Sequence, residues 1–289
     1  MFIHLKNVSF TYNLHMPFET EVLKSVNITI NKGEFVGIIG HTGCGKTTLL
    51  QIFNGLLEPT EGQVLIDGID IHKERKKLKE IRKSIGLTFQ YPENQLFEET
   101  IFKEIAFGPK NMGIKDDQLE KKVRKAMGMV GLNYSIYKER SPFSLSGGEM
   151  RRVAIASTLA IDPEIIILDE PTASLDPQSR YGLLKLTREL HQRYQKTIIL
   201  VSHNMEVVAE LAQRILVMEK GRIIMDDTPR IIFQDFADQI ESIGLALPQI
   251  TSIMHKLKKM GKPVNSGVLT IEEAKDEILK LTNKKKEVR

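Results

Sequence analysis

The stretch GHTGCGKTT, residues 40–48, decides the fold of this 289-residue chain. It fits the pattern G-x-x-x-x-G-K-[ST], and the strand candidate EFVGII, residues 34–39, leads directly into it. The glycines allow backbone N–H groups to turn inward around an anion, and residues 47–57 are expected to present a helix N-terminus to the same point. A glycine-rich turn that only caps a helix is the alternative, but the strand before the loop and the helix after it argue against that. The stretch therefore predicts a loop that binds the phosphates of a nucleoside triphosphate.

Two side chains of this loop have their own expected tasks. Lys46 would bring a positive charge to the β- and γ-phosphates, and Thr47 would offer its hydroxyl to Mg²⁺. The predicted nucleotide-binding residues of the loop are Gly40, His41, Thr42, Gly43, Cys44, Gly45, Lys46, Thr47 and Thr48.

The composition allows one large domain with a smaller appendage, since 289 residues and 41% hydrophobic content support a sizeable core. The net charge of +4, from 41 basic and 37 acidic residues, is too weak a bias to imply nucleic acid as a partner. The chain shows no secretory signal at its start, and no run approaches the roughly 18 apolar residues of a membrane span. We expect a protein that is soluble by itself, so that any work at a membrane requires another chain.

Cys44 is the only cysteine of the sequence, which excludes an internal disulfide and suits a reducing compartment. It lies two residues before Lys46, at the start of the predicted helix. A neighbouring cation and a helix N-terminus lower thiol pKa values. We therefore expect a reactive thiol that maleimide labels, with inhibition of hydrolysis, unless the nucleotide is bound.

The residues before the phosphate loop alternate between apolar and polar side chains, which predicts antiparallel strands at 2–10 and 26–30. Tyr12 follows the first strand, where it could stack on a purine or serve as a partly buried aromatic at a strand end. After the loop we expect a strand and turn at 63–68, a charged helix up to Lys83, and a strand at 84–90 that ends in Gln90.

Residues 91–162 have helical periods, with loops at several prolines and glycines, and predict a helical insertion. Within it, LSGGE at 145–149 precedes a helix at 150–160. Ser146 as the N-cap would leave N–H groups at the positive helix end, which makes a second anion site. For an isolated SGG, a helix start without any ligand is the favoured alternative.

A buried strand at 165–168 leads into Asp169 and Glu170. Ligands of open α/β sheets bind at the carboxyl ends of such strands. We expect Asp169 to orient the Mg²⁺ shell and Glu170 to polarise the attacking water. The strand at 197–201 is followed by His203, which would contribute to the site at the same sheet edge or have only a structural role. Residues 214–219 and 222–225 predict a terminal hairpin.

The tail predicts two short amphipathic helices. Residues 248–260 place Ile250, Ile253, Met254 and Leu257 on one stripe. Thr270 and Glu273 form a capping box before a second helix, whose apolar residues are Ala274, Ile278 and Leu281. We divide the chain into a nucleotide-binding domain at 1–229, with the helical insertion at 91–162, and a C-terminal helical extension at 230–289.

Taken together, these motifs resemble the nucleotide-binding ATPases of ABC transporters over residues 1–228. The resemblance implies that residues 40–48 are the Walker A loop, Gln90 the Q-loop glutamine, 145–149 the signature, 165–170 the Walker B strand, 174–176 the D-loop and His203 the switch histidine. It implies an α/β fold: a P-loop NTPase core with an N-terminal antiparallel β subdomain, an inserted helical subdomain and a small C-terminal helical extension.

The resemblance also implies roles for residues far apart in the chain. Tyr12 would stack on adenine, and two subunits would meet head to tail, so that one subunit covers the ATP bound to the other. The covering residues would be Ser146, Gly147, Gly148, Glu149 and Asp176. The catalytic residues would be Glu170, His203 and Gln90, and the Mg²⁺ ligands Thr47, Gln90 and Asp169. The implied cofactors are ATP and Mg²⁺.

Shorter stretches resemble one branch of that family. TFQYPENQLF at 88–97, the loop at 13–21 and SPFSLSGGEMRRVAIA at 141–156 are similar to the second of two paralogous ATPases in energy-coupling factor (ECF) transporters, which import vitamins and transition metals. This implies a paralogous ATPase or a second copy as dimer partner, with the C-terminal extension as a contact. It also implies a transmembrane coupling protein, a substrate-binding membrane subunit and a place at the cytoplasmic face of the membrane.

In that branch, Gln95, Leu96 and Phe97 would border a groove for the coupling helices of the membrane partner. The nearby acids Glu93, Glu98 and Glu99 would border it too, or would simply form a solvated helix start. The alternatives for the whole chain are an ATPase of another ABC importer or exporter, a soluble ABC ATPase without a transport role, and a nucleotide-binding regulator without turnover.

Overall fold

A six-stranded sheet forms the centre of the computed structural model, which describes residues 3–287, with side chains described up to Lys280. The sheet has the order β10-β9-β3-β8-β7-β6. Its strands are β3 (Phe35–Ile39), β6 (Ile85–Thr88), β7 (Ile165–Asp169), β8 (Thr197–Val201), β9 (Arg214–Glu219) and β10 (Arg222–Asp227). The strands from β9 to β6 run parallel, and β10 pairs with β9 antiparallel. The predicted core strands and the terminal hairpin are confirmed, except that β6 ends at Thr88, two residues before Gln90, the predicted last residue of that strand.

A second, four-stranded sheet has the order β2-β1-β4-β5. It consists of β1 (Ile3–Tyr12), β2 (Thr20–Ile30), β4 (Glu61–Ile66) and β5 (Ile69–Asp70). All of its pairs are antiparallel, as predicted for the N-terminal strands, although β2 begins six residues earlier than expected. Phe2, the expected first strand residue, lies outside the described residues.

Helix α1 (Lys46–Phe53) lies between the two sheets and ends four residues before the predicted position. Its apolar side chains share one buried cluster with β3 and with the inner face of β1. Helix α2 (Arg75–Ser84), the charged helix of the prediction, covers the outer end of this subdomain. The phosphate loop is therefore held between a strand and a helix that are both fixed by packing on two sides.

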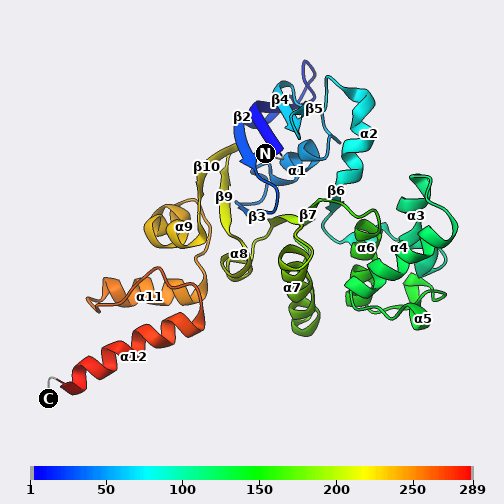
Figure 1. Cartoon of the computed structure of the whole chain (residues 1–289). Helices are drawn as coiled ribbons and strands as arrows, with labels where there is room; N and C mark the ends of the chain where they lie inside the picture. Colours follow the sequence, from blue (N-terminus) through cyan, green and yellow to red (C-terminus); the bar gives the residue numbers. More distant parts are fainter. Residues whose placement is uncertain (1–2, 288–289) are drawn as a thin grey trace.

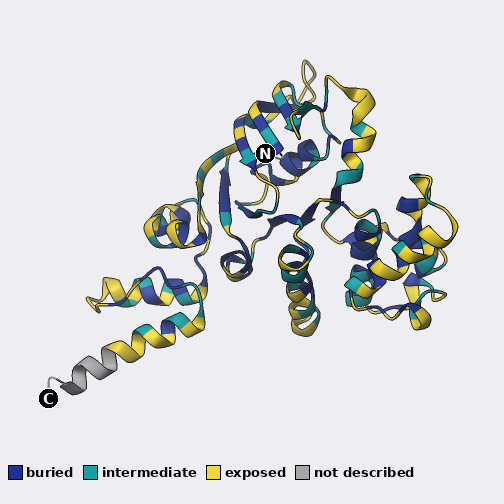
Figure 2. Ribbon diagram, viewed as in Figure 1, coloured by how far each residue is buried: buried dark blue, intermediate teal, exposed yellow. Residues whose placement is uncertain are grey.

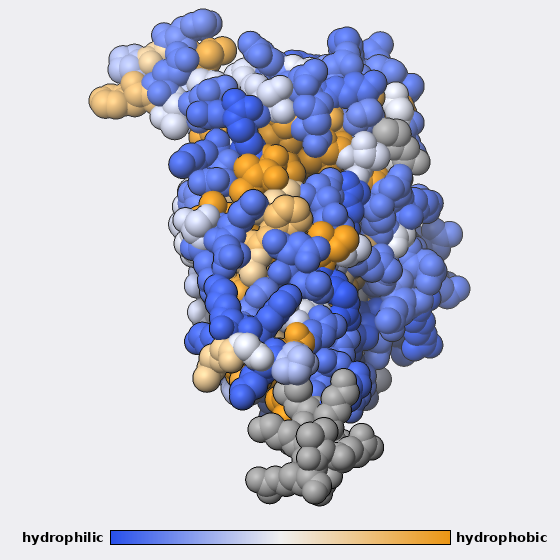
Figure 3. Space-filling model, turned by 90° about the vertical axis from the view of Figure 1, so that its left-hand side faces the viewer, coloured by the Kyte–Doolittle hydropathy of each residue, from blue (hydrophilic) through white to orange (hydrophobic). Residues whose placement is uncertain are grey.

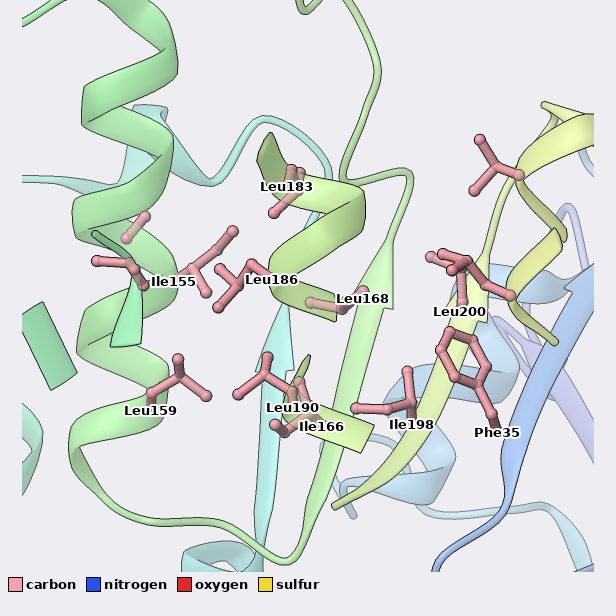
Figure 4. Close-up of a cluster of buried hydrophobic side chains, with 14 of the residues drawn as sticks. Phe35, Ile155, Leu159, Ile166, Leu168, Leu183, Leu186, Leu190, Ile198 and Leu200 are labelled. Atoms are coloured by element: carbon pink, nitrogen blue, oxygen red, sulfur yellow. The ribbon is translucent and has the colours of Figure 1, made fainter. Parts of the chain in front are cut away.

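Helices α7 (Pro177–Gln192) and α8 (Met205–Leu211) lie on the opposite face of the six-stranded sheet (Figure 1). Figure 4 shows Leu183, Leu186 and Leu190 of α7 close to Ile166 and Leu168 of β7. Because helices cover the parallel strands on one face and α1 covers the other, these strands consist of continuous aliphatic runs.

The helical insertion packs as a separate lobe beside β6 and β7 (Figure 1). Its elements are η1 (Pro92–Gln95), α3 (Ile101–Asn111), α4 (Asp116–Met129), α5 (Tyr134–Tyr137), η2 (Pro142–Ser144) and α6 (Gly147–Ala160). The lobe shares the large buried cluster with the core through α6, whose Ile155 and Leu159 face α7 in Figure 4. The predicted helical character of residues 91–162 is confirmed.

Within residues 3–287, four helices follow the hairpin, where the sequence predicted two. They are α9 (Pro229–Asp235), α10 (Ala237–Ser242), α11 (Gln249–Lys259) and α12 (Ile271–Glu287). The two missed helices insert Ile232, Phe233 and Ile240 into the main core. They were missed because each is only six or seven residues long, too short to show a helical period.

The two predicted tail helices are present and pack around a small cluster of their own that includes Met254 and Ala274. Ile253 departs from the expected stripe, since 49% of it is exposed, and Leu281 lies outside the described side chains. Thr270 does cap α12 by accepting from the N–H of Glu273 at 3.2 Å. The Glu273 carboxylate accepts from the N–H of Leu269 at 2.9 Å.

Exposed residues occupy the outer faces of the helices, while the strands of the core are buried (Figure 2). The face in Figure 3 is mostly hydrophilic, with apolar surface gathered in its upper half. Among the helices within residues 3–287, none is long and apolar enough to cross a membrane.

Candidate nucleotide-binding site

A cavity of about 450 Å³ opens at the carboxyl edge of the parallel strands. It is lined by Tyr12, Val22, Thr42, Gly43, Gly45, Lys46, Thr47, Thr48, Gln90, Asp169, Glu170 and His203. The structure thus brings together residues from the ends of β1, β3, β6, β7 and β8. Val22 on β2 was missed by the sequence analysis, and its position follows from the antiparallel pairing of β2 with β1 beside Tyr12.

Close packing explains the glycines of the loop. Gly45 has φ +106°, and a Cβ there would lie 2.9 Å from Leu23 Cδ2 and 3.0 Å from the carbonyl oxygen of Val22. At Gly40 a Cβ would lie only 2.4 Å from the carbonyl oxygen of Met218. The backbone therefore passes close to its neighbours and leaves its N–H groups, rather than side chains, to line the bottom of the cavity.

Lys46 is the first residue of α1 and is 7% exposed. Its Nζ donates to the carbonyl oxygens of Gly40 at 2.6 Å and His41 at 2.9 Å. This ammonium group and the N-terminus of α1 supply the positive charge of the cavity. The loop fits the phosphates of a nucleotide for these two reasons.

Oxygen ligands for a divalent cation lie beside the loop. The Thr47 hydroxyl donates to Oδ2 of Asp169 at 3.1 Å, and Gln90 lines the same cavity. Burial raises the pKa of Asp169, and the Thr47 hydrogen bond and the Lys46 charge oppose that rise. No group of three or more His, Cys, Asp or Glu side chains within the described residues could hold a metal alone. The oxygen set fits Mg²⁺, which proteins usually hold with few side chains and with substrate phosphates.

Glu170 and His203 follow neighbouring strands and approach each other closely. Oε1 of Glu170 lies 3.4 Å from Nε2 of His203 and has no hydrogen-bond partner among the described residues. Burial, and then the charge of Asp169, raise the pKa of Glu170 to about 7. Burial, followed by the charge of Lys46, lowers the pKa of His203. A carboxylate with this pKa can accept a proton from water near neutral pH.

Tyr12 lies at the rim of the cavity. Its hydroxyl is 3.3 Å from Oγ1 of Thr48, and its ring meets Phe10 edge-on at a centroid distance of 4.7 Å. The ring is 39% exposed, so that one side is available to an aromatic base. Stacking on adenine stays a prediction.

The signature residues do not line this cavity. Ser146 caps α6 and forms a capping box with Glu149, in which each residue accepts from the backbone N–H of the other. Gly147 and Gly148 follow at the exposed start of that helix. Asp176 caps α7 by accepting from the N–H groups of Gln178 and Ser179. Within one chain, the structure therefore leaves Ser146, Gly147, Gly148, Glu149 and Asp176 apart from the phosphate loop.

The expected lowering of the Cys44 thiol pKa is wrong. Its side chain is 1% exposed, and burial raises the pKa of the thiol against the opposing charge of Lys46, whose Nζ lies 3.9 Å from Sγ. The turn between β9 and β10 covers this part of the loop, since the N–H of Gly221 donates to the carbonyl oxygen of Cys44. Residues that are distant in sequence thus remove the thiol from solvent.

Comparison with known proteins agrees with this geometry. The family model for ABC transporters matches residues 23–173. The energy-coupling factor transporter ATP-binding protein EcfA2 of Clostridium tetani is 52% identical over 285 residues, which cover 99% of both chains. EcfA2 of Caldanaerobacter subterraneus is 52% identical over 278 residues, 96% of each chain.

Two solved structures share the fold. CbiO1 of Clostridium perfringens, part of the ABC transporter complex cbiONQ, is 35% identical with a TM-score of 0.74 and covers 88% of this chain and 98% of its own. The ATP-binding cassette MJ0796, solved as a dimer bound to ADP and phosphate, is 32% identical with a TM-score of 0.70 and covers 78% and 98%. By its motifs, its fold and its near full-length identity to these relatives, the chain belongs to the ATP-binding proteins of energy-coupling factor transporters, within the ABC transporter family.

Proposed function

We propose that this chain hydrolyses ATP to drive a vitamin or transition-metal importer of the energy-coupling factor type, from the cytoplasmic face of the membrane. One observation carries the proposal. A single cavity joins the phosphate loop to Asp169, Glu170 and His203. The start of α6 at Ser146, Gly147 and Gly148, here called the Ser146 corner, lies outside this cavity. The cavity supplies one half of an ATPase site, and the corner is a surface that can complete the site of another subunit.

The residues of the cavity suit hydrolysis of the terminal phosphate. Lys46 and the loop N–H groups would hold the phosphates, and Glu170 would take a proton from the attacking water as the bond between the β-γ bridging oxygen and the γ-phosphorus breaks. His203 and Gln90 would contact the γ-phosphate from two sides. When bound, Mg²⁺ would neutralise charge on the phosphate oxygens, and Thr47, Asp169 and Gln90 are the residues that would hold it.

The second half of each site would come from a partner ATPase, either a paralogue or a second copy. The helix end at Ser146 is exposed and presents the first N–H groups and the positive end of α6. The Ser146 hydroxyl donates to the Glu149 carboxylate at 2.8 Å in this chain and would turn to a partner's nucleotide on assembly. The dimeric structure of MJ0796 with ADP and phosphate lends support by similarity. Head-to-tail closure would exclude water and make turnover depend on assembly.

The contact with the membrane partner would lie at a second cavity, of about 290 Å³, at the edge of the helical lobe. Gln95, Leu96 and Phe97 line it, and Phe97 meets Phe107 edge-on at 5.0 Å between ring centroids. Glu98 and Glu99 do not line this cavity, and Glu93 is bound to Arg151. An apolar groove with exposed aromatic rings suits an amphipathic coupling helix. The C-terminal extension, residues 230–289, would add a dimer contact.

Isolation of the natural assembly tests the proposal. A tagged chain, purified from membranes of its own cells, should bring with it a second ATPase, a transmembrane coupling protein and a substrate-binding membrane subunit. The assembly should hydrolyse ATP about 100-fold faster than the isolated chain. The isolated chain lacks the hydrogen-bond donors that the partner's helix end at Ser146 would bring to the nucleotide. EDTA should abolish that activity. Co-purification of nucleic acid or ribosomes without membrane proteins would contradict the proposal, and an exporter as partner would select the alternative within the family.

A further inference from the structure

Arg151 occupies an unusual position on α6, five residues after Ser146. Its side chain is almost completely buried, with 2% of the residue exposed. The guanidinium donates to both carboxylate oxygens of Glu93, from Nε at 2.9 Å and from Nη2 at 2.6 Å. Nη1 donates to the carbonyl oxygens of Pro171 at 2.9 Å and Ala173 at 2.7 Å. One side chain therefore joins three separate segments of the chain.

Two of those segments adjoin residues that line the nucleotide cavity, Glu170 and Gln90. Pro171 and Ala173 directly follow Glu170, and the N–H of Ala173 donates to the carbonyl oxygen of Glu170 at 3.1 Å. Glu170 itself has φ +48°. A non-glycine residue in this left-handed conformation persists only where the surrounding structure holds it. The bonds from Arg151 hold the carbonyls of Pro171 and Ala173, one and three residues after Glu170.

Glu93 belongs to the other segment. It lies three residues after Gln90, in η1 between the phosphate cavity and the groove at Phe97. Burial raises the pKa of Glu93, but the hydrogen bonds and the charge of Arg151 outweigh it and hold this pKa below its usual value. A bidentate pair of this kind fixes both distance and orientation.

We propose that Arg151 is a positioning residue for hydrolysis, which fixes the Glu170 loop and the segment after Gln90 as one unit with the signature helix. A movement of residues 95–97, which line the groove, would then shift Glu93, Arg151 and the loop after Glu170 together. The inference rests on the proposed function, because it assigns Arg151 to the same ATPase site. It adds a direct link, through a single guanidinium, between the groove and the catalytic carboxylate.

The test compares Arg151→Met with Arg152→Met in the assembled ATPase. Arg152 is the next residue of α6, and its Nη1 reaches only the carbonyl oxygen of Val130, at 3.5 Å, among the hydrogen bonds of the described residues. We expect Arg151→Met to lower kcat by about 10- to 100-fold, because a misplaced catalytic group costs that much, while KM for ATP stays within about twofold. Arg152→Met should leave both nearly unchanged. Equal effects of the two variants, or a loss that falls on KM, would overturn the inference.

Glu93→Gln provides a second variant that keeps Arg151 and its bonds to Pro171 and Ala173. It should lower kcat less than Arg151→Met does, and the double variant should be no slower than Arg151→Met alone, since both changes break the same connection. If the fold losses of kcat in the two single variants multiply in the double variant, Arg151 and Glu93 have independent roles, and the inference is contradicted. If Arg151→Met does not fold, the kcat and KM of Glu93→Gln decide: a lower kcat at unchanged KM supports the link, and unchanged values refute it.

Amide hydrogen exchange separates this inference from the proposed function, because it needs no turnover. In the isolated chain, Arg151→Met should speed exchange in residues 170–176 and 91–98, and Arg152→Met should not. If the wild-type assembly fails to hydrolyse ATP, the proposed function fails, while the exchange pattern still decides whether Arg151 holds the two segments. If the exchange in both segments is unchanged in Arg151→Met, the inference fails whatever the activity.

Discussion

Oε1 of Glu170 lies 3.4 Å from Nε2 of His203, at the carboxyl ends of the neighbouring strands β7 and β8. The parallel register places both residues at the carboxyl edge of the sheet, where the phosphate loop also follows β3. Burial keeps this carboxylate poorly solvated and its pKa close to neutral, while the imidazole pKa is lowered. A proton acceptor and a polar side chain thus face the position expected for the terminal phosphate.

Replacement of Glu170 by Gln should stop hydrolysis and preserve nucleotide binding. The amide keeps the shape of the side chain but cannot accept the proton of the attacking water, so kcat of the assembly should fall by about 100-fold or more. The phosphate loop is untouched, so the Kd for ATP should stay the same. Phosphate release and fluorescent-nucleotide titration measure the two quantities. Glu164→Gln, at an exposed position just before β7, is the control and should retain full turnover. Normal turnover in Glu170→Gln would remove Glu170 from its role.

The same substitution should stabilise the isolated chain in a pH-dependent way. The pKa of Glu170 is about 7 in the folded state and near 4.5 when unfolded, so the folded state holds a proton between these pH values that the unfolded state has lost. Stability therefore falls as pH rises from about 4.5 to 7, and the full cost of the buried charge is present above pH 7. Glu170→Gln should raise the free energy of unfolding by up to about 3 kcal/mol at pH 8 and by much less at pH 5. Urea titrations at both pH values test this, and an equal gain at both would contradict it.

Cys44 should react slowly in the native protein. Its thiol is buried and its pKa is raised, so both access and the thiolate fraction are low. We expect maleimide labelling at neutral pH to be far slower than for free glutathione and to become rapid in urea, as followed by mass spectrometry. Cys44→Ser should bind ATP with an unchanged Kd, because the loop uses the backbone N–H at this position. Rapid labelling of the folded chain would show that the loop opens in solution.

Ser146→Ala should affect catalysis far more than stability. The loss of an N-cap costs about 1 kcal/mol, and Thr228→Ala, at the cap of α9, provides a control of the same kind. Both variants should melt a few degrees lower. In the assembly, only Ser146→Ala should reduce hydrolysis, by about 100-fold, because in the proposed head-to-tail arrangement Ser146 would donate to the partner's nucleotide. Similar hydrolysis in the two variants would leave Ser146 with a structural role alone.

The sequence was sufficient where a local pattern and its chemistry coincide. The strand before the phosphate loop, the aliphatic strand before Asp169 and the strand before His203 predicted one sheet edge. The structure places Lys46, Asp169 and His203 around one cavity, whereas Gly40 does not line it. Ser146 as the cap of α6 followed from residue type and spacing. Each of these features depends on neighbours within a few residues.

Features set by distant residues could not be predicted in this way. Cys44 is buried by a turn at Gly221, almost 180 residues later in the chain. Arg151 carried no local signal, because its partners Glu93 and Ala173 belong to other motifs. Helices α9 and α10 were too short for a period to show. In all three cases, tertiary packing decides the outcome.

The structure of the ATP-bound Glu170→Gln variant, together with its partner ATPase, tests the central claim most directly. We expect the Ser146 corner of each subunit to lie within hydrogen-bond distance of the γ-phosphate held by Lys46 of the other, with the Glu170→Gln side chain facing the same phosphate. An assembly in which ATP is bound at the loop while every Ser146 corner remains in solvent, far from any γ-phosphate, would contradict the account.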